Sequence, residues 1–179
     1  MKKLTAILLI ILSLLTFSSC EKMTVEDSAA KLCEAIKAKD EAALLGYVDG
    51  LYFYEPELSD VLTDALYLSS RYTVGNITEV DSKNKTVDIT FENIDINTIL
   101  TQADALIARE GFDEKNIDSD YHTSDIISIY TNVLRDNAEN YVTKTVSVSF
   151  VKKSGNWIAQ FDEDSSKEFM GAFFGGYEF

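Results

Sequence analysis

Residues 146–161 read VSVSFVKKSGNWIAQF, and this stretch decides the fold class of the 179-residue sequence. Apolar residues alternate with other residues through Val146, Val148 and Phe150, and they alternate again from Trp157 to Phe161. Period-two alternation is typical of a strand with one buried face, and the Lys-Ser-Gly-Asn between the two runs is typical of a turn. The stretch therefore predicts an antiparallel hairpin.

A second hairpin is predicted from residues 79–94, EVDSKNKTVDITFENI. Val87, Ile89 and Phe91 alternate with polar residues, and a β-rich run precedes them over 72–80. Gly75 interrupts that run and puts its apolar residues out of phase, which indicates a β-bulge.

Helical spacing surrounds the hairpins. Thr24 and Asp27 form a capping pattern ahead of a helix whose apolar stripe includes Cys33, which we expect to be buried and inert. Asp40 is expected to cap a short helix over 41–48. Further helices are expected from Pro56 to about Ser70, over 96–107, from Ser124 onward, and after Ser165, which together with Glu168 resembles a capping box.

These elements predict an α+β fold with a curved antiparallel sheet of about four strands in two hairpins, packed by N-terminal, central and C-terminal helices. No repeat, low-complexity tract or proline-rich linker divides the sequence. We therefore expect a single domain over residues 24–179.

This order of elements resembles the small bacterial lipoproteins built on a cystatin-like, or nuclear transport factor two-like, domain. The resemblance is carried by SAAKLCEAIKAKDEAALLGYV (28–48), by the two hairpins, and by FMGAFFGG (169–176) after the second one. It implies the shape of the fold and little else, because the functions of these families are mostly unknown.

The first twenty residues, MKKLTAILLIILSLLTFSSC, have the layout of a bacterial secretory signal. Two lysines precede an uncharged run over 4–17, which is shorter than the roughly 20 apolar residues that a transmembrane helix needs. Ser18 and Ser19 before Cys20 resemble a lipobox, although Phe17 replaces the aliphatic residue of that pattern.

The lipobox resemblance implies that residues 1–19 are a signal peptide and that Cys20 carries a thioether-linked diacylglycerol. Residues 20–23 would then be a lipidated tether, and the membrane would be a partner through the acyl chains. The alternative is an ordinary secretory signal cleaved near Ser19, which would leave Cys20 as a free thiol. Either reading places the protein on the extracytoplasmic side of a bacterial membrane.

The chain is strongly acidic, with 30 acidic residues against 16 basic ones and a net charge of −14. Removing the leader makes this balance more negative still, because the leader contains Lys2 and Lys3 and no acidic residue. Such a charge excludes nucleic acid as a partner, since its binders need cationic surfaces. It favours cationic partners, or a solvated acidic surface with no partner at all.

The acidic segment from Asp113 to Asp125 is the one cluster that could ligate a cation. Asp118 and Asp120 alternate as in a calcium loop, but Thr123 replaces the required glycine and Ile129 the final glutamate. His122 is the only histidine, which is too few for a zinc site. These departures exclude an EF-hand and favour a solvated loop, with Asp125 near a helix N-terminus, over a looser calcium site. We expect no metal, and no motif in the sequence predicts a cofactor or a catalytic residue.

Four aromatic residues are candidates for contact with a ligand or partner: Tyr52, Phe53, Tyr54 and Trp157. The first three precede Glu55-Pro56-Glu57 and form either an exposed aromatic and acidic patch or a segment packed under the helices. Tyr177 and Phe179 follow the Gly-Gly that ends the last helix, where they could touch a partner or fill a pocket.

The leading hypothesis is a lipid-anchored binding or interaction module of the cell envelope, with a small ligand, a peptide or an envelope protein as partner. One alternative is an enzyme that performs acid–base chemistry in a pocket between sheet and helices, and another is a structural envelope protein without a ligand. An open pocket holding an ionisable residue of shifted pKa would favour the enzyme. A pocket filled by aromatic side chains would favour the interaction module.

Overall fold

The computed structural model describes residues 23–110 and 120–179, with a five-stranded sheet in the order β1-β5-β4-β3-β2. Neighbouring strands are antiparallel except β1, which runs parallel to β5. The strands are β1 (Val48–Asp49), β2 (Arg71–Glu79), β3 (Asn84–Ile94), β4 (Tyr141–Lys153) and β5 (Asn156–Gln160). Both hairpins are confirmed, and so is the irregularity in β2, where the register shifts between Val74 and Ile77.

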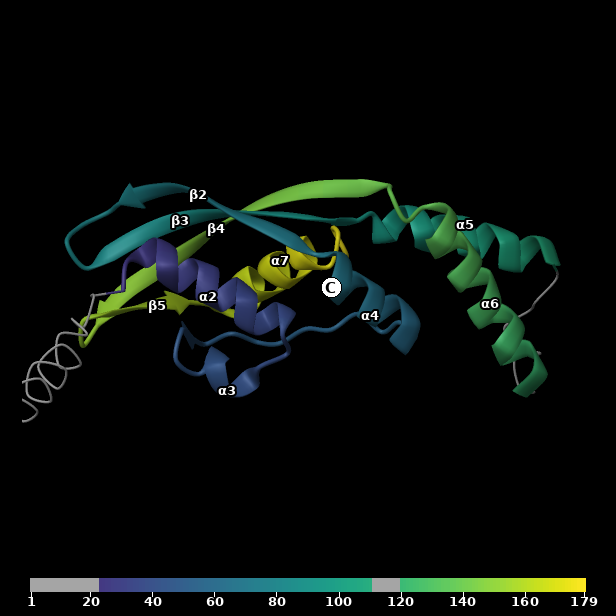
Figure 1. Ribbon diagram of the computed structural model, residues 1–179, viewed down its shortest axis with the longest axis horizontal. Coiled ribbons are helices and arrows are strands. Elements are labelled where there is room, and N and C mark those ends of the chain that lie inside the picture. Colours follow the sequence, from purple (N-terminus) through teal and green to yellow (C-terminus); the bar gives the residue numbers. More distant parts are fainter. Residues whose placement is uncertain (1–22, 111–119) are drawn as a thin grey trace, which may run out of the picture.

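Helices cover one face of the curved sheet, and a helical pair extends from one end of it (Figure 1). The pair consists of α5 (Ile96–Glu110) and α6 (Asp120–Asp136). The others are α2 (Val25–Lys37), α3 (Glu41–Leu44), α4 (Asp60–Ser69) and α7 (Glu163–Phe173). This arrangement confirms the predicted α+β class with an open, curved sheet.

The core lies between the sheet and the helices α2, α4 and α7. Alternate residues of β3 and β4 face it, and Val87, Ile89, Val146 and Val148 are all buried. Residues between them, such as Thr90 and Thr145, lie on the opposite face, where their hydroxyls are 2.8 Å apart. The alternation in the sequence therefore correctly predicts which residues lie on each face of the sheet.

The capping prediction for α2 is confirmed. The Thr24 hydroxyl accepts a hydrogen bond from Asp27 N–H at 3.0 Å, and Asp27 Oδ2 accepts one from Thr24 N–H at 3.0 Å. Cys33, on the same helix, is buried as expected, and burial raises the pKa of its thiol.

Several predicted boundaries were wrong. Residue 48 belongs to β1 rather than to the helix after Asp40, because Ala159 N–H donates to Tyr47 O and draws this segment onto β5. Pro56 lies ahead of α4, which begins at Asp60. The helix expected from Ser124 already begins at Asp120, so Ser124 lies inside α6.

The cap of α7 was also placed one turn too late. Asp162, not Ser165, is the N-cap residue, and Ser165 is the third helical residue of a reciprocal capping box. Asp162 Oδ1 accepts from Ser165 N–H at 2.8 Å, and the Ser165 hydroxyl accepts from Asp162 N–H at 2.9 Å. The Ser165 hydroxyl also donates to Asp162 Oδ1 at 2.5 Å, and this bond together with the one from Ser165 N–H lowers the pKa of the Asp162 carboxyl, because both favour its charged form.

A buried asparagine joins three elements at the end of the sheet. Asn93, which is 0% exposed, donates through Nδ2 to the backbone oxygens of Leu66 at 3.0 Å and of Phe173 at 2.6 Å. Its Oδ1 accepts from Ile94 N–H at 2.8 Å and from the Ser69 hydroxyl. One side chain thus ties the C-terminal ends of α4 and α7 to β3.

Candidate functional site

The interior space that could have formed a pocket between sheet and helices is filled by aromatic rings. Phe91 contacts Phe169 and Phe173 edge to face, with ring centroids 5.2 and 5.7 Å apart. Phe173 and Phe174 are 4.9 Å apart, and all four rings are fully buried. Such edge-to-face packing stabilises the core and leaves the candidate binding regions at the surface.

Two hollows lie between β4 and α7. The first, of about 420 Å³, is bounded by Lys144–Val146 on β4, by the C-terminal residues Gly176–Phe179, and by four residues of α7: Lys167, Glu168, Gly171 and Ala172. The second, of about 350 Å³, is bounded by Val146–Ser149 and by Gln160–Asp162 with the first turns of α7. Val146 and Glu168 line both hollows, so we call them together the β4 groove.

The groove follows an edge of β4 that is only partly paired. On one side, β3 pairs with β4 from Tyr141 to Val151. On the other side, β5 pairs only with Ser149–Lys153. Figure 1 shows this difference, because β5 lies beside one end of the long β4 strand. Within the described part of the chain, residues 141–148 of β4 therefore have no strand beside them on the groove side.

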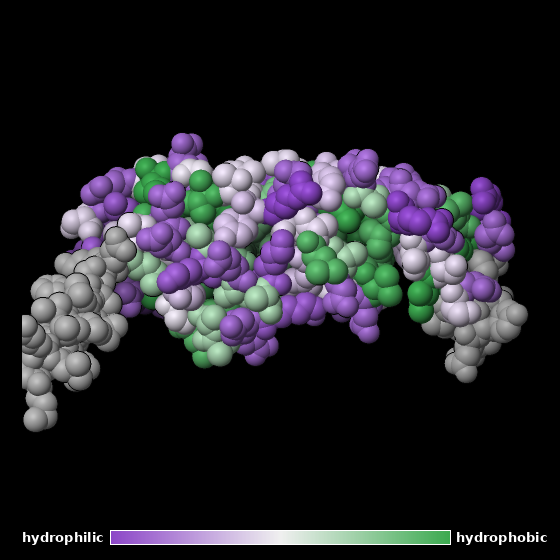
Figure 2. All heavy atoms as spheres, in the orientation of Figure 1, coloured by the Kyte–Doolittle hydropathy of each residue, from purple (hydrophilic) through white to green (hydrophobic). Residues whose placement is uncertain are grey.

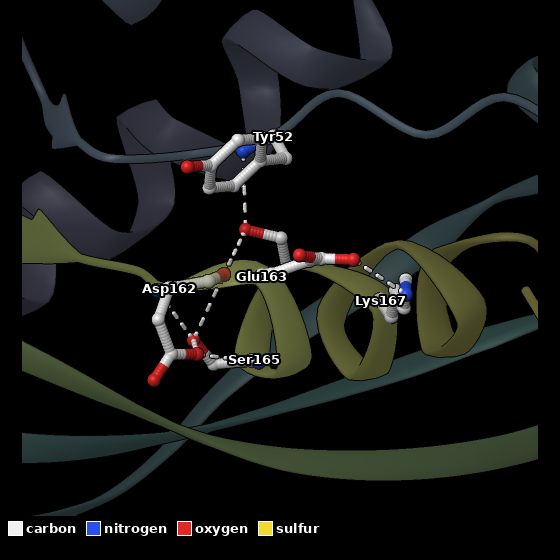
Figure 3. A network of polar contacts seen from close by, with 6 residues as sticks. Tyr52, Asp162, Glu163, Ser165 and Lys167 are labelled. Atoms are coloured by element: carbon white, nitrogen blue, oxygen red, sulfur yellow. Dashed lines mark hydrogen bonds and ion pairs between the residues drawn. The ribbon is translucent and has the colours of Figure 1, made fainter.

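The aromatic segment 52–54 lies next to the N-terminal turns of α7 (Figure 3). Tyr52 N–H donates to the Ser166 hydroxyl at 3.1 Å, and that hydroxyl donates to the backbone oxygen of Asp162 at 2.5 Å. The Tyr52 and Phe53 side chains remain 56% and 45% exposed. Of the two alternatives for this segment, the exposed one holds for Tyr52 and Phe53.

Tyr54 is half-buried and belongs to a cluster with the C-terminus. Its ring lies 5.4 Å from Phe179, which in turn lies 4.9 Å from Tyr177. Lys167 lies 5.5 Å from the Tyr54 ring and forms an ion pair with Glu163 at 2.8 Å. Desolvation, with the nearby Glu163 carboxylate, raises the pKa of Tyr54. Lys167 and Phe179, which lie beside Tyr54, also line the first hollow.

Trp157, the fourth aromatic candidate, is elsewhere. Its side chain is 5% exposed, and the ammonium groups of Lys85 and Lys152 each lie 5.3 Å from its ring. The residue contributes to the wall of a separate hollow of about 220 Å³ with Tyr47 and Met23. Because it is buried under two lysines, Trp157 does not offer the open ring surface that a ligand contact requires.

The residues that an acid–base enzyme of this shape could use are dispersed. Tyr72 faces the core side of β2, where it donates to Glu34 at 3.2 Å, and burial raises its pKa to about 12. Asp88 lies on the opposite face of the sheet and accepts from the Ser147 hydroxyl at 2.6 Å. Tyr130 pairs with Asp104 on the α5–α6 pair. These groups share no pocket.

Cys20 and the leader lie outside the described residues, as does most of the acidic segment 113–125. Asp120, His122 and Asp125 lie on α6, and the Asp125 side chain is exposed. In residues 23–110 and 120–179, no group of three His, Cys, Asp or Glu side chains could hold a metal ion. None of the helices in this part of the chain is long and apolar enough to cross a bilayer.

Figure 2 shows a mostly hydrophilic face with apolar patches over α3 and α4. Leu45, directly after α3, and Leu68 on α4 are the most exposed large apolar residues among those described, at 84% and 81%. They lie in different segments, and neither lines any of the three hollows described above. The β4 groove remains the better-formed candidate site.

No known family model matches the sequence, and no curated protein matches it. The structure is similar to the crystal structure of ycdA from Bacillus subtilis, an inferred lipoprotein, with a TM-score of 0.42 and 15% sequence identity. The match covers 82% of this chain and 44% of that one, so this chain spans less than half the length of the protein it matches.

Proposed function

We propose that the protein is a lipid-anchored binding module on the extracytoplasmic side of a bacterial envelope, with Cys20 as the acylated residue. The leader and the lipobox-like residues before Cys20 support the anchor. A short tether is consistent with it, because the capped helix α2 begins at Val25. Assignment of the fold to the cystatin-like domains is part of the same proposal.

The observation that supports a binding function is that aromatic rings fill the interior of the fold, whereas the β4 groove is open at the surface. Phe91, Phe169, Phe173 and Phe174 occupy the space in which a pocket enzyme would hold its substrate. Beside them, the β4 groove presents polar strand residues and the aromatic C-terminus on the surface. This combination favours an interaction module over an acid–base enzyme.

The anchor is tested by Cys20→Ser in the producing bacterium, followed by separation of membrane and soluble fractions. We expect the wild-type protein in the membrane fraction and the variant in the soluble fraction, because two or more acyl chains give stable anchoring. Ser19→Ala, which keeps a small residue before the cysteine, is the matched control and should stay with the membrane. Retention of Cys20→Ser in the membrane, or a mature N-terminus without fatty acid by mass spectrometry, would contradict the proposal.

A further inference from the structure

We propose that the open edge of β4 binds an extended, basic peptide segment of another protein, which adds to the sheet as a further strand. This inference rests on the proposed binding function and names the class of ligand. It follows from the direction of the backbone groups of β4, from the space beside them, and from the charge around that space.

The hydrogen bonds of the sheet fix which residues of β4 face the groove. Lys152 N–H donates to Lys83 O, and Asp95 N–H donates to Asn140 O, so the even-numbered residues at both ends of β4 face β3. The register between them is continuous. Because successive residues of a strand direct their backbone groups to opposite sides, the odd-numbered residues face the other way.

The far side of the sheet gives the same result independently. Ala159 N–H donates to Tyr47 O, so Ala159 faces β1 and its neighbour Gln160 faces β4. Gln160 is the register partner of Ser149, an odd-numbered residue. The next odd-numbered residues along β4 are Ser147, Thr145 and Thr143, which lie beyond the end of β5.

The backbone groups of Thr143, Thr145 and Ser147 therefore point into the groove. In the described part of the chain, no donor or acceptor pairs with them on that side. An unpaired row of N–H and C=O groups is a template for another strand, and β-strand addition is a common mode of peptide recognition.

The groove has room for such a strand. Hollows of about 420 and 350 Å³ lie side by side between β4 and α7, and they share Val146 and Glu168. The β4 residues that line them, 144–149, extend over about 20 Å at the rise of a strand. An added strand would continue the line of β5 from the point where β5 ends at Gln160.

The charge of the second hollow selects a basic peptide, whereas the first hollow is mixed, with Lys144 and Lys167 beside Glu168 and Glu178. Asp162 and Glu168 line the second hollow, whose lining contains no basic residue. Glu168 has no ion-pair partner among the described residues, and the whole chain carries a net charge of −14. The same charge disfavours a second copy of this acidic chain as the occupant, because like-charged surfaces repel each other. At the other end of the groove, Tyr177 and Phe179 offer ring surface to an aliphatic side chain.

The test uses the purified full-length protein and a fluorescein-labelled peptide of sequence Lys-Val-Lys-Val-Lys-Val-Lys, with Glu-Val-Glu-Val-Glu-Val-Glu as the acidic control. Binding is measured by fluorescence anisotropy. We expect the basic peptide to bind and the acidic one not to bind. On binding, the amides of Thr143, Thr145 and Ser147 should exchange more slowly with solvent, as expected for newly paired N–H groups.

Thr145→Pro separates strand addition from simple charge attraction. Proline removes the N–H that faces the groove and leaves the backbone hydrogen bonds between β4 and β3 in place, which is the position that strands tolerate. The contact between the Thr145 and Thr90 hydroxyls is lost in this variant and in the Thr145→Val control alike. We expect the peptide to bind about tenfold more weakly, as for the loss of one well-formed backbone hydrogen bond. Thr145→Val keeps the N–H and should bind within about twofold of the wild type.

A second pair of variants keeps the test decisive if Thr145→Pro does not fold. Glu168→Lys and Asp164→Lys change the net charge equally on exposed positions of α7, but only Glu168 lines the groove. We expect Glu168→Lys to weaken binding of the basic peptide and Asp164→Lys to weaken it much less.

Three results would overturn the inference: no binding of the basic peptide, equal binding by Thr145→Pro and Thr145→Val, or equal loss in the two lysine variants. A concentration-dependent dimer that Thr145→Pro abolishes, without effect on the peptide, would assign the edge to a second copy instead. Each of these results is independent of the membrane fractionation of Cys20→Ser, so failure of the peptide site and failure of the anchor are distinguishable.

Discussion

The replacement Asn93→Ala tests whether one buried side chain holds α4, α7 and the end of β3 together. In the native protein, Asn93 donates to Leu66 O and Phe173 O and accepts from Ile94 N–H. The backbone oxygen of Leu66 retains another donor in the variant, because Ser70 N–H also bonds to it at 3.1 Å. Phe173 O and Ile94 N–H lose the partner that the Asn93 side chain provides.

The cost follows from these two groups. A buried backbone group left without a partner costs about 1–3 kcal/mol, so two of them lower the free energy of unfolding by about 4 kcal/mol. This is a large part of the roughly 5–15 kcal/mol by which a domain is stable. The loss should appear as a lower urea midpoint with an unchanged slope, since the surface exposed on unfolding is nearly the same.

Urea unfolding followed by the fluorescence of Trp157, the one tryptophan in the chain and a buried residue, provides the measurement. Asn132→Ala is the control, because Asn132 is exposed on α6 and its replacement should change stability by less than about 0.5 kcal/mol. A loss below about 1 kcal/mol for Asn93→Ala would refute the reasoning, because it would mean that water or a small shift satisfies both orphaned groups.

Three further predictions concern the backbone, the thiol and the response to acid. Gly175→Ala should lower the thermal midpoint more than Gly155→Ala. Both residues have positive φ, at 68° and 92°, so the backbone strain of an alanine is shared by the two variants. An added Cβ would lie 2.0 Å from Ile94 O at Gly175, but would meet nothing within 4 Å at Gly155. Equal midpoints would mean that the backbone at Gly175 moves freely. Cys33 should stay unmodified by iodoacetamide in the native protein and react after denaturation, because the residue is 1% exposed and burial raises the pKa of its thiol. Peptide mass spectrometry locates the label, and rapid labelling of Cys33 in the native protein would contradict this prediction. Asp162→Asn should lower the thermal midpoint at pH 7. The difference in midpoint from the wild type should shrink as the pH falls below 3.8, because a carboxyl whose folded-state pKa is lowered stabilises the fold only while it is charged. A difference that stays constant between pH 7 and pH 3 would exclude this contribution.

The sequence predicted those parts of the fold in which apolar residues recur at a regular spacing. The runs around Ile89 and Val148 alternate over many residues, so their strands, their faces and their hairpins could be inferred from the sequence alone. The strand β1 could not, because it contains two residues and depends on bonds from Ala159 on β5 and from Phe161 directly after β5. Nor could the role of Asn93, whose partners lie 27 and 80 residues away in the sequence.

The candidate site was harder to predict than the fold. The alternation that revealed the second hairpin also places Trp157 among the buried residues, so the sequence contained the reason to discard that candidate. The cap of α7 was misplaced because Asp162 and Ser165 form one capping pattern and Ser165 with Glu168 form an overlapping one. The β4 groove depends on the difference in length between β4 and β5 and on where α7 lies beside them, and no local pattern encodes that combination.

The position of the α5–α6 pair has a consequence for how the molecule would stand on a bilayer. The described chain starts beside α2 at one end of the elongated body, and the helical pair projects from the opposite end (Figure 1). A protein tethered through Cys20 would therefore act as a spacer, with its helical tip as the part that reaches furthest into the surrounding compartment. Shortening that tip would alter what the protein can reach without altering how it is held.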